Sequence, residues 1–270
     1  MKKNSLVSTF YLLLSIYPCL GFGLAFMLES SSFAMGRGND CMDEMKAALS
    51  EKMAKGIKPK QAYISVIKMY EKKGCAEEVK SLLTEMISCG MNPGVSIYNS
   101  VLNAYVQLGD GDKAEAFLAT MIGIDAHPNL KSYNSVINAY SNGNLPDKAE
   151  AFLATMIGID AHPDITSYNA VLSAYAKAGP PDKAEAFLAT MIGIDAHPDI
   201  TSYNVVLSAY VKAGLPDKAE AFLVTMIGID AHPNLESYNL VIDAYERAGR
   251  TDKAQAIRHD SHFLLNMNLR

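Results

Sequence analysis

The sequence predicts an all-α fold in which helical hairpins stack to form a solenoid. The first observation is a 17-residue segment, DKAEAFLATMIGIDAHP, which occurs three times, at 112–128, 147–163 and 182–198. A fourth copy differs only at Val224, and successive copies begin 35 residues apart. A fixed period of this length is typical of repeat architectures. The second observation is that each period carries two amphipathic segments separated by turn residues, which indicates one helical hairpin per repeat.

The first half of the unit 130–164 predicts a helix of about three turns. Its apolar residues recur at the spacing i, i+3, i+4 and i+7 of one buried helical face. These residues are Tyr133, Val136, Ile137 and Tyr140. The sequence Asn-Gly-Asn at 142–144 then ends the helix.

Pro146 and Asp147 open a second helix, in which we expect Asp147 to cap the free amides and Glu150 to complete a capping box. Its buried stripe consists of Ala149, Phe152, Leu153 and Met156. A hairpin with two apolar stripes cannot bury both by itself, so neighbouring units must stack.

Composition is compatible with a folded chain of this kind. The 270 residues are 49% hydrophobic and carry a formal net charge of −5. Disorder and collagen-like structure are therefore excluded. Because there is no basic excess, any polyanionic partner must be held by local contacts.

Residues 1–34 differ from the rest of the chain. After Lys2 and Lys3 no charge occurs from Asn4 to Leu28, and the segment ends in Ser-Phe-Ala, a small-x-small pattern typical of signal cleavage. We expect a signal peptide here. The alternative is an uncleaved signal anchor, because the uncharged length is close to the roughly 20 residues that span a bilayer.

The four cysteines do not predict a metal site, since none of their spacings is typical of zinc. They are Cys19, Cys41, Cys75 and Cys89. If the chain is exported, Cys75 and Cys89 are candidates for a disulfide, and isolated reduced cysteines are the alternative.

The unit resembles the pentatricopeptide repeat. The shared features are Tyr-Asn near its start, Ala-Tyr in the first helix, a Gly turn, Asp-Lys-Ala opening the second helix, a later Met and a terminal Pro-Asp or Pro-Asn. The Trp and Leu-Gly pattern of the tetratricopeptide relative is lacking. The resemblance covers roughly residues 60–258 and implies a right-handed superhelix of stacked helix-turn-helix repeats.

The repeat frame sets the expected organisation. We expect a partial repeat or cap at 35–59, a degenerate repeat at 60–94, four full repeats at 95–234, and a truncated repeat with a tail at 235–270.

The resemblance implies binding of single-stranded RNA, with about one base per repeat. In the family the fifth residue of a unit meets the base edge and the last residue helps to select the base. The fifth-position residues here are Asn99, Asn134, Asn169 and Asn204, with Asn239 in the truncated unit, and the unit-end residues are Asn129, Asp164, Asp199 and Asn234. Asn with Asp resembles the family's uracil pairing, and Asn with Asn resembles its pairing for cytosine or uracil. The prediction is a C/U-U-U-C/U tract, with the N-terminal units toward the RNA 5′ end.

The resemblance also implies phosphate contacts near the end of the first helix, where Lys177, Lys212 and Arg247 occupy equivalent places. The first two full units depart from this pattern with Gln107 and Asn142. At the second position, where the family usually has Val or Ile against the base, the chain has Ser96, Lys131, Thr166, Thr201 and Glu236. We therefore expect weaker stacking on the bases.

The main alternative is a protein-binding scaffold, because each full repeat is net negative and acidic solenoids commonly present a concave face to peptides. Asn near a helix start is also favoured without any ligand. No motif predicts catalysis, a cofactor or a small-molecule substrate. We expect loop histidines rather than metal ligands at His127, His162, His197 and His232, and the pair His259 and His262 lacks two further zinc ligands.

Localisation stays open at this point. The family usually works in mitochondria or plastids, but residues 1–34 look secretory rather than like an Arg-rich presequence. A plastid reached through the secretory system and export are both compatible with the segment. A membrane is a partner only if the segment remains as an anchor.

Overall fold

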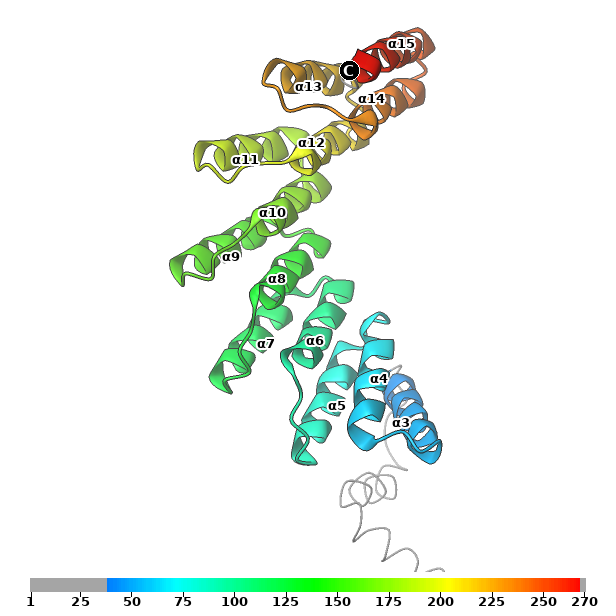
Figure 1. Ribbon diagram of the computed structural model, residues 1–270, viewed down its shortest axis with the longest axis vertical. Coiled ribbons are helices and arrows are strands. Elements are labelled where there is room, and N and C mark those ends of the chain that lie inside the picture. Colours follow the sequence, from blue (N-terminus) through cyan, green and yellow to red (C-terminus); the bar gives the residue numbers. More distant parts are fainter. Residues whose placement is uncertain (1–37, 268–270) are drawn as a thin grey trace, which may run out of the picture. The chain divides into compact units, whose positions relative to one another are not determined.

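A computed structural model describes residues 38–267, and every regular element in this part of the chain is an α-helix (Figure 1). The helices are α3 (Gly38–Ala54), α4 (Pro59–Glu71), α5 (Ala76–Ser88), α6 (Val95–Leu108), α7 (Gly111–Gly123), α8 (Leu130–Asn142), α9 (Pro146–Gly158), α10 (Ile165–Ala178), α11 (Pro181–Gly193), α12 (Ile200–Lys212), α13 (Pro216–Gly228), α14 (Leu235–Arg247) and α15 (Thr251–Met267). The fold is an all-α solenoid of repeated hairpins, as predicted; the right-handed superhelical turn stays a prediction. Residues 259–267, expected to follow the repeats as a tail, continue α15.

The predicted signal segment at 1–34 lies outside the described residues. Within 38–267, none of the helices is both long and apolar enough to cross a membrane.

The chain divides into two compact units. Among the described residues, the first unit comprises 38–107 and 119–128, and the second comprises 108–118 and 129–267. The division passes through α7, a feature that the uniform repeat does not predict.

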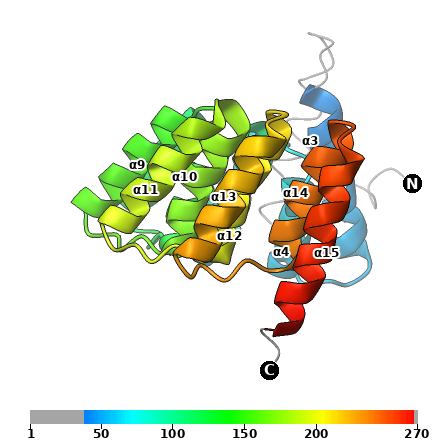
Figure 2. The same ribbon diagram turned by 90° about the horizontal axis from the view of Figure 1, so that it is seen from above.

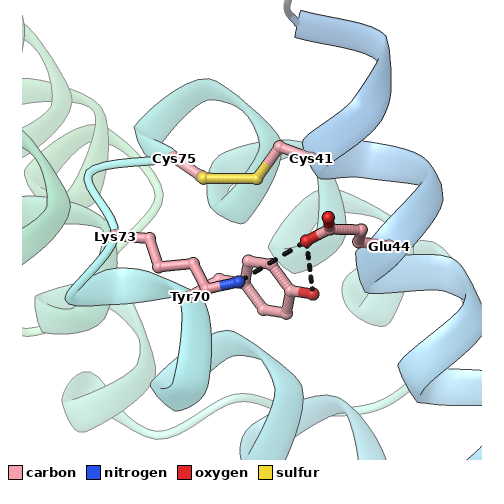
Figure 3. Close-up of a disulfide and its surroundings, with 5 residues drawn as sticks. All are labelled: Cys41, Glu44, Tyr70, Lys73 and Cys75. Atoms are coloured by element: carbon pink, nitrogen blue, oxygen red, sulfur yellow. Dashed lines mark hydrogen bonds and ion pairs between the residues drawn. A yellow bond between two sulfur atoms is a disulfide. The ribbon is translucent and has the colours of Figure 1, made fainter.

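In the first unit, α3 packs against α4 and a disulfide joins Cys41 to Cys75, whose Cα atoms are 6.9 Å apart. Figure 3 shows Glu44 beside this bond, where it accepts hydrogen bonds from the Tyr70 hydroxyl at 3.3 Å and the Lys73 ammonium at 3.5 Å. The expected alternatives for the cysteines, a pair between Cys75 and Cys89 or reduced thiols, are therefore both wrong for Cys75. The reason is the docking of α3, which brings its first turns beside Cys75 at the N-cap of α5.

In the second unit, the first helices from α10 onward pack against the second helix of their own hairpin and of the preceding one. Thus α10 contacts α9 and α11, and α12 contacts α11 and α13 (Figures 1 and 2). The predicted stripes form the core, since Val136, Ile137, Ala149 and Met156 are fully buried. Burial of about 25 cal/mol per Å² of apolar surface makes this stacking the main source of stability.

The capping prediction for the second helix is wrong. Leu145 is the N-cap of α9 and makes no side-chain cap, while Pro146 takes the first helical position and Asp147 lies inside the first turn. Proline is preferred at that position because it lacks the N–H that would be unpaired there. The capping boxes instead start the first helices, where the unit-end residues Asn129, Asp164, Asp199 and Asn234 are the N-caps.

Side chains also join successive repeats. The Tyr140 hydroxyl donates to Glu115 and lies 3.1 Å from Asp112, whose carboxylate contacts the Lys148 ammonium at 2.6 Å. Burial, followed by the bond to Glu115, raises the pKa of Tyr140. The hydroxyls of Tyr175, Tyr210 and Tyr245 make the same bonds to Glu150, Glu185 and Glu220. These glutamates therefore fix the register between neighbouring hairpins.

The loops after the second helices carry two residues with left-handed backbone. Asp160 has φ 58° and His162 has φ 48°, and the other copies match them. Aspartate tolerates this conformation because its short polar side chain can hydrogen-bond locally. The histidine's left-handed backbone was not predicted.

Candidate nucleic-acid interface

The fifth-position asparagines of the second unit lie one turn into α8, α10 and α12. Asn134 is 9% exposed, Asn204 is 6% exposed, and Asn169 is half-buried. They are recessed between neighbouring hairpins rather than standing free of the surface.

A serine of the next repeat holds the amide oxygen of each of these residues. The Ser167 hydroxyl donates to Asn134 Oδ1 at 2.6 Å, Ser202 donates to Asn169 at 2.6 Å, and Ser237 donates to Asn204 at 2.7 Å. The same serine oxygens accept the backbone N–H of the unit-end residue, as in Asp199 N–H to Ser202 at 3.1 Å. Each hydroxyl has one hydrogen to donate, and for Ser202 the competing acceptor is Asp199 Oδ1 at 3.0 Å. The asparagine oxygen takes the hydrogen because it is closer.

The amide nitrogens point toward the unit-end residues. Asn169 Nδ2 donates to Asp199 Oδ1 at 3.3 Å, and Asn204 Nδ2 donates to Asn234 Oδ1 at 3.3 Å. Asn134 lies near enough to Asp164 to help lower the pKa of that carboxyl. The structure therefore brings together two of the pairs that the repeat frame predicts, Asn169 with Asp199 and Asn204 with Asn234.

Three further residues are predicted to contact bases, namely Asn99, Asn129 and Asn239. Asn99 is buried in α6 of the first unit, whereas the exposed Asn129 caps α8 in the second. Asn239 is exposed on α14.

The unit-end carboxylates are held in the ionised form. Burial raises the pKa of Asp199, but hydrogen bonds from Ser202, Asn169 and Thr201 outweigh it and leave the pKa below its usual value. The same balance, with Ser167, Asn134 and Thr166, lowers the pKa of Asp164. At neutral pH both groups are therefore acceptors only.

The second-position residues lie at the edge of these pairs. Thr166 and Thr201 are exposed, and they help to lower the pKa of Asp164 and Asp199. Glu236, also exposed, instead accepts from Asn204 Nδ2 at 3.3 Å.

The predicted phosphate contacts lie at the opposite ends of the first helices. The Lys177 ammonium donates to Asn142 Oδ1 at 3.0 Å and to Ser141 Oγ at 3.3 Å in the preceding repeat. Partial burial, followed by repulsion from Lys212, lowers the pKa of Lys177. Lys212 and Arg247 are exposed.

The loop histidines each face a neighbouring aspartate, as His162 Nδ1 faces Asp160 Oδ1 at 3.3 Å. No group of three metal-ligating side chains occurs among the described residues. The side chain of His262 is outside them, so the pair with His259 stays untested.

Sequence reasoning missed the serines that position the amides. The signal was present, because Ser-Tyr-Asn recurs at 132–134, 167–169 and 202–204. A serine three residues after Asn or Asp indicates a reciprocal cap, and its position two residues before the next asparagine places it at the repeat interface.

Comparison with known proteins supports this frame. A model of the PPR repeat matches residues 62–91, 131–160, 201–230 and 236–260, a PPR repeat family model matches 93–142, and a pentatricopeptide repeat domain model matches 155–213. No curated protein matches the chain.

Solved structures of pentatricopeptide repeat proteins also resemble the chain. The pentatricopeptide repeat protein PPR10 from maize is 27% identical with a TM-score of 0.64, over 84% of this chain and 33% of that one. PPR10 in complex with an 18-nt psaJ RNA element is 28% identical with a TM-score of 0.58, over 83% of this chain and 31% of that one. The chain therefore spans about a third of the length of PPR10.

Proposed function

Because the chain belongs to the pentatricopeptide repeat family, we propose that it binds single-stranded RNA and reads about one base per repeat. The RNA complex of PPR10 supports this function class. The proposal assigns the chain a non-enzymatic role in the processing, stability or translation of its RNA.

The main support for RNA binding is the regular pairing of fifth-position and unit-end residues. The pairs Asn134 with Asp164, Asn169 with Asp199, and Asn204 with Asn234 recur at one register in successive hairpins. Each offers donors and acceptors to the Watson–Crick edge of a splayed-out base. Repeating the same pair along stacked helices suits an extended strand.

The preferred tract is C/U-U-U-C/U, with Asn134 and Asn169 reading uracil. One N–H of Asn169 donates to Asp199, which orients the amide. Its second N–H bonds no acceptor among the described residues, so it is available to the O4 or O2 oxygen of uracil. Because the asparagine amides lie recessed between hairpins, the base edge must move in toward them to make the contact.

The phosphate backbone is held by Lys177, Lys212 and Arg247. The mutual repulsion of Lys177 and Lys212 is relieved when an anion lies between them. Three contacts to a single strand predict a slope of log K against log salt of about −2.

A binding titration of residues 35–270 against oligo-U, oligo-C, oligo-A and oligo-G tests the proposal. We expect pyrimidines to bind most tightly, with affinity falling about twentyfold between about 50 and about 200 mM salt. Asn169→Thr with Asp199 retained changes one repeat to a pair that resembles the family's guanine pair. We expect the base preference of that repeat to shift toward guanine. Equal, weak binding of all four at low salt overturns the proposal.

A protein-binding scaffold that uses the concave solenoid face is the second candidate, and exposed isoleucines near the C-terminal ends of the second helices favour protein binding. Ile157 is 52% exposed and Ile159 is 54% exposed, and the other copies match them. Between Glu150 and Asp160 the sequence carries no charge. If RNA binding fails, this uncharged face is the surface on which to look for a protein partner.

We propose further that the chain enters the secretory route and reaches an organelle, a plastid or mitochondrion, with export as the alternative. The disulfide between Cys41 and Cys75 supports passage through an oxidising compartment, where such bonds persist. Microscopy of the full chain fused to a fluorescent protein at its C-terminus distinguishes the two destinations. A fusion that stays diffuse in the cytosol contradicts both.

A further inference from the structure

Glu236 breaks the pattern of the second-position residues in the second unit. Thr166 and Thr201 help to lower the pKa of the unit-end aspartates. Neither threonine is hydrogen-bonded to a fifth-position amide in the described part of the chain. Glu236 reaches the amide itself, where its Oε2 lies 3.3 Å from Asn204 Nδ2.

The hydrogen-bond inventory of the Asn204 amide is therefore full on the donor side. Its two N–H groups go to Asn234 Oδ1 and Glu236 Oε2, both at 3.3 Å, and its oxygen accepts from Ser237 at 2.7 Å. An amide has two such hydrogens and no more. In the preceding repeat, Asn169 uses one N–H on Asp199 and has the other for a ligand.

We infer that Glu236 is a specificity-determining residue that makes the Asn204 repeat read cytosine in preference to uracil. The inference rests on the proposed RNA-binding function, which leaves that repeat open to either pyrimidine. Where the other repeats offer an N–H to the base, this one offers a carboxylate oxygen.

The chemistry of the two pyrimidines decides between them. Cytosine carries an amino group at C4 that donates to a carboxylate, whereas uracil carries an oxygen there. A uracil oxygen facing Glu236 puts two acceptors against each other, so this contact lacks the hydrogen bond that cytosine makes. The exposed position of Glu236 allows its carboxylate to bond the base without leaving Asn204.

The test compares the RNAs UUUC and UUUU, whose last base is the one assigned to Asn204. We expect the wild-type full chain to bind UUUC at least about fivefold more tightly, the lower limit for one good base contact. Glu236→Thr, which installs the residue found at 166 and 201, is expected to abolish or reverse this ratio. Glu246→Gln is the matched control, because it removes one negative charge from the same helix at an exposed site that pairs with Arg258.

Removing either negative charge strengthens binding of both RNAs, so the ratio is the informative quantity. A ratio that falls in Glu236→Thr and not in Glu246→Gln supports the inference. If the wild type binds both RNAs equally, or if Glu236→Thr keeps the ratio, the inference is wrong while RNA binding stands. If the wild type binds neither, the proposed function and the inference fail together.

Discussion

At the residue scale, the serines of the capping boxes connect two repeats. Ser202 completes the cap of α12 with Asp199 and also donates to Asn169 on α10. It is completely buried, so its hydroxyl has no access to water as a substitute partner. The orientation of the Asn169 amide therefore depends on a residue outside its own repeat.

Ser202→Ala is expected to lower the free energy of unfolding by about 1–2 kcal/mol, because a cap is lost and the Asn169 oxygen loses its buried donor. Urea unfolding measures this change. Ser208→Ala is the matched control on the same helix, and we expect a change within about 0.5 kcal/mol. Equal effects of the two substitutions would contradict the double role of Ser202.

The capping aspartates predict an acid sensitivity. The folded-state pKa values of Asp164 and Asp199 lie below their usual values. Their contribution to stability is present above the unfolded value of about 3.9 and is lost as the pH falls below it toward the folded value.

The double variant Asp164→Asn with Asp199→Asn is expected to lose less stability than the wild type as the pH falls below about 4. Asparagine keeps the cap, since Asn234 accepts from the Ser237 N–H at 3.0 Å in the same way. Thermal melts from neutral to acidic pH measure the difference. If the wild type and the double variant lose the same stability as the pH falls, these carboxylates do not cause the acid sensitivity.

At the element scale, turns that allow close approach set the packing of the second unit. A Cβ on Gly143 would lie 2.3 Å from the Gly109 carbonyl oxygen, whereas a Cβ on Gly158 would meet no heavy atom within 4 Å. Both are at helix ends, but only Gly143 faces backbone that cannot rotate away.

Gly143→Ala is therefore expected to destabilise the chain by about 1–3 kcal/mol through overpacking. Gly158→Ala is the control, and we expect it to change stability by less than about 1 kcal/mol. Chemical denaturation of both variants provides the measurement. A neutral Gly143→Ala would mean that the turn moves to make room.

The helices themselves follow from the sequence, because period, apolar spacing and turn residues agree in every copy. The cap of α9 does not, because Pro146 makes Leu145 the N-cap and moves Asp147 into the helix. The Tyr140 to Glu115 bond depends on the register between hairpins, which one repeat read alone does not contain. The sequence identifies the paired asparagines, because their places in the repeat are fixed. It does not identify the serines that hold them, because those contacts also cross between hairpins.

At the scale of the whole molecule, a solenoid distributes stability among neighbouring repeats. A substitution in one repeat should therefore change the stability of that repeat and its direct neighbours, and not that of distant repeats. The disulfide between Cys41 and Cys75 closes a loop with a sequence separation of 34 and ties α3 to the first hairpin.

Cys41→Ser is expected to release α3 at a cost of about 2–4 kcal/mol to its docking, because the unfolded segment regains its freedom. Hydrogen exchange should show faster exchange in α3 and unchanged protection in α12, α13 and α14. Loss of protection throughout the chain would contradict a nearest-neighbour solenoid.

The central claim is that asparagines at one register in successive hairpins bind the bases of a single RNA strand. Side-chain amide NMR signals of Asn134, Asn169 and Asn204 report on this contact without any substitution. Saturating oligo-U should shift the signals of Asn134 and Asn169, and oligo-A at the same concentration should leave them in place. Signals that stay unmoved while oligo-U binds would place the RNA elsewhere on the chain and contradict the claim.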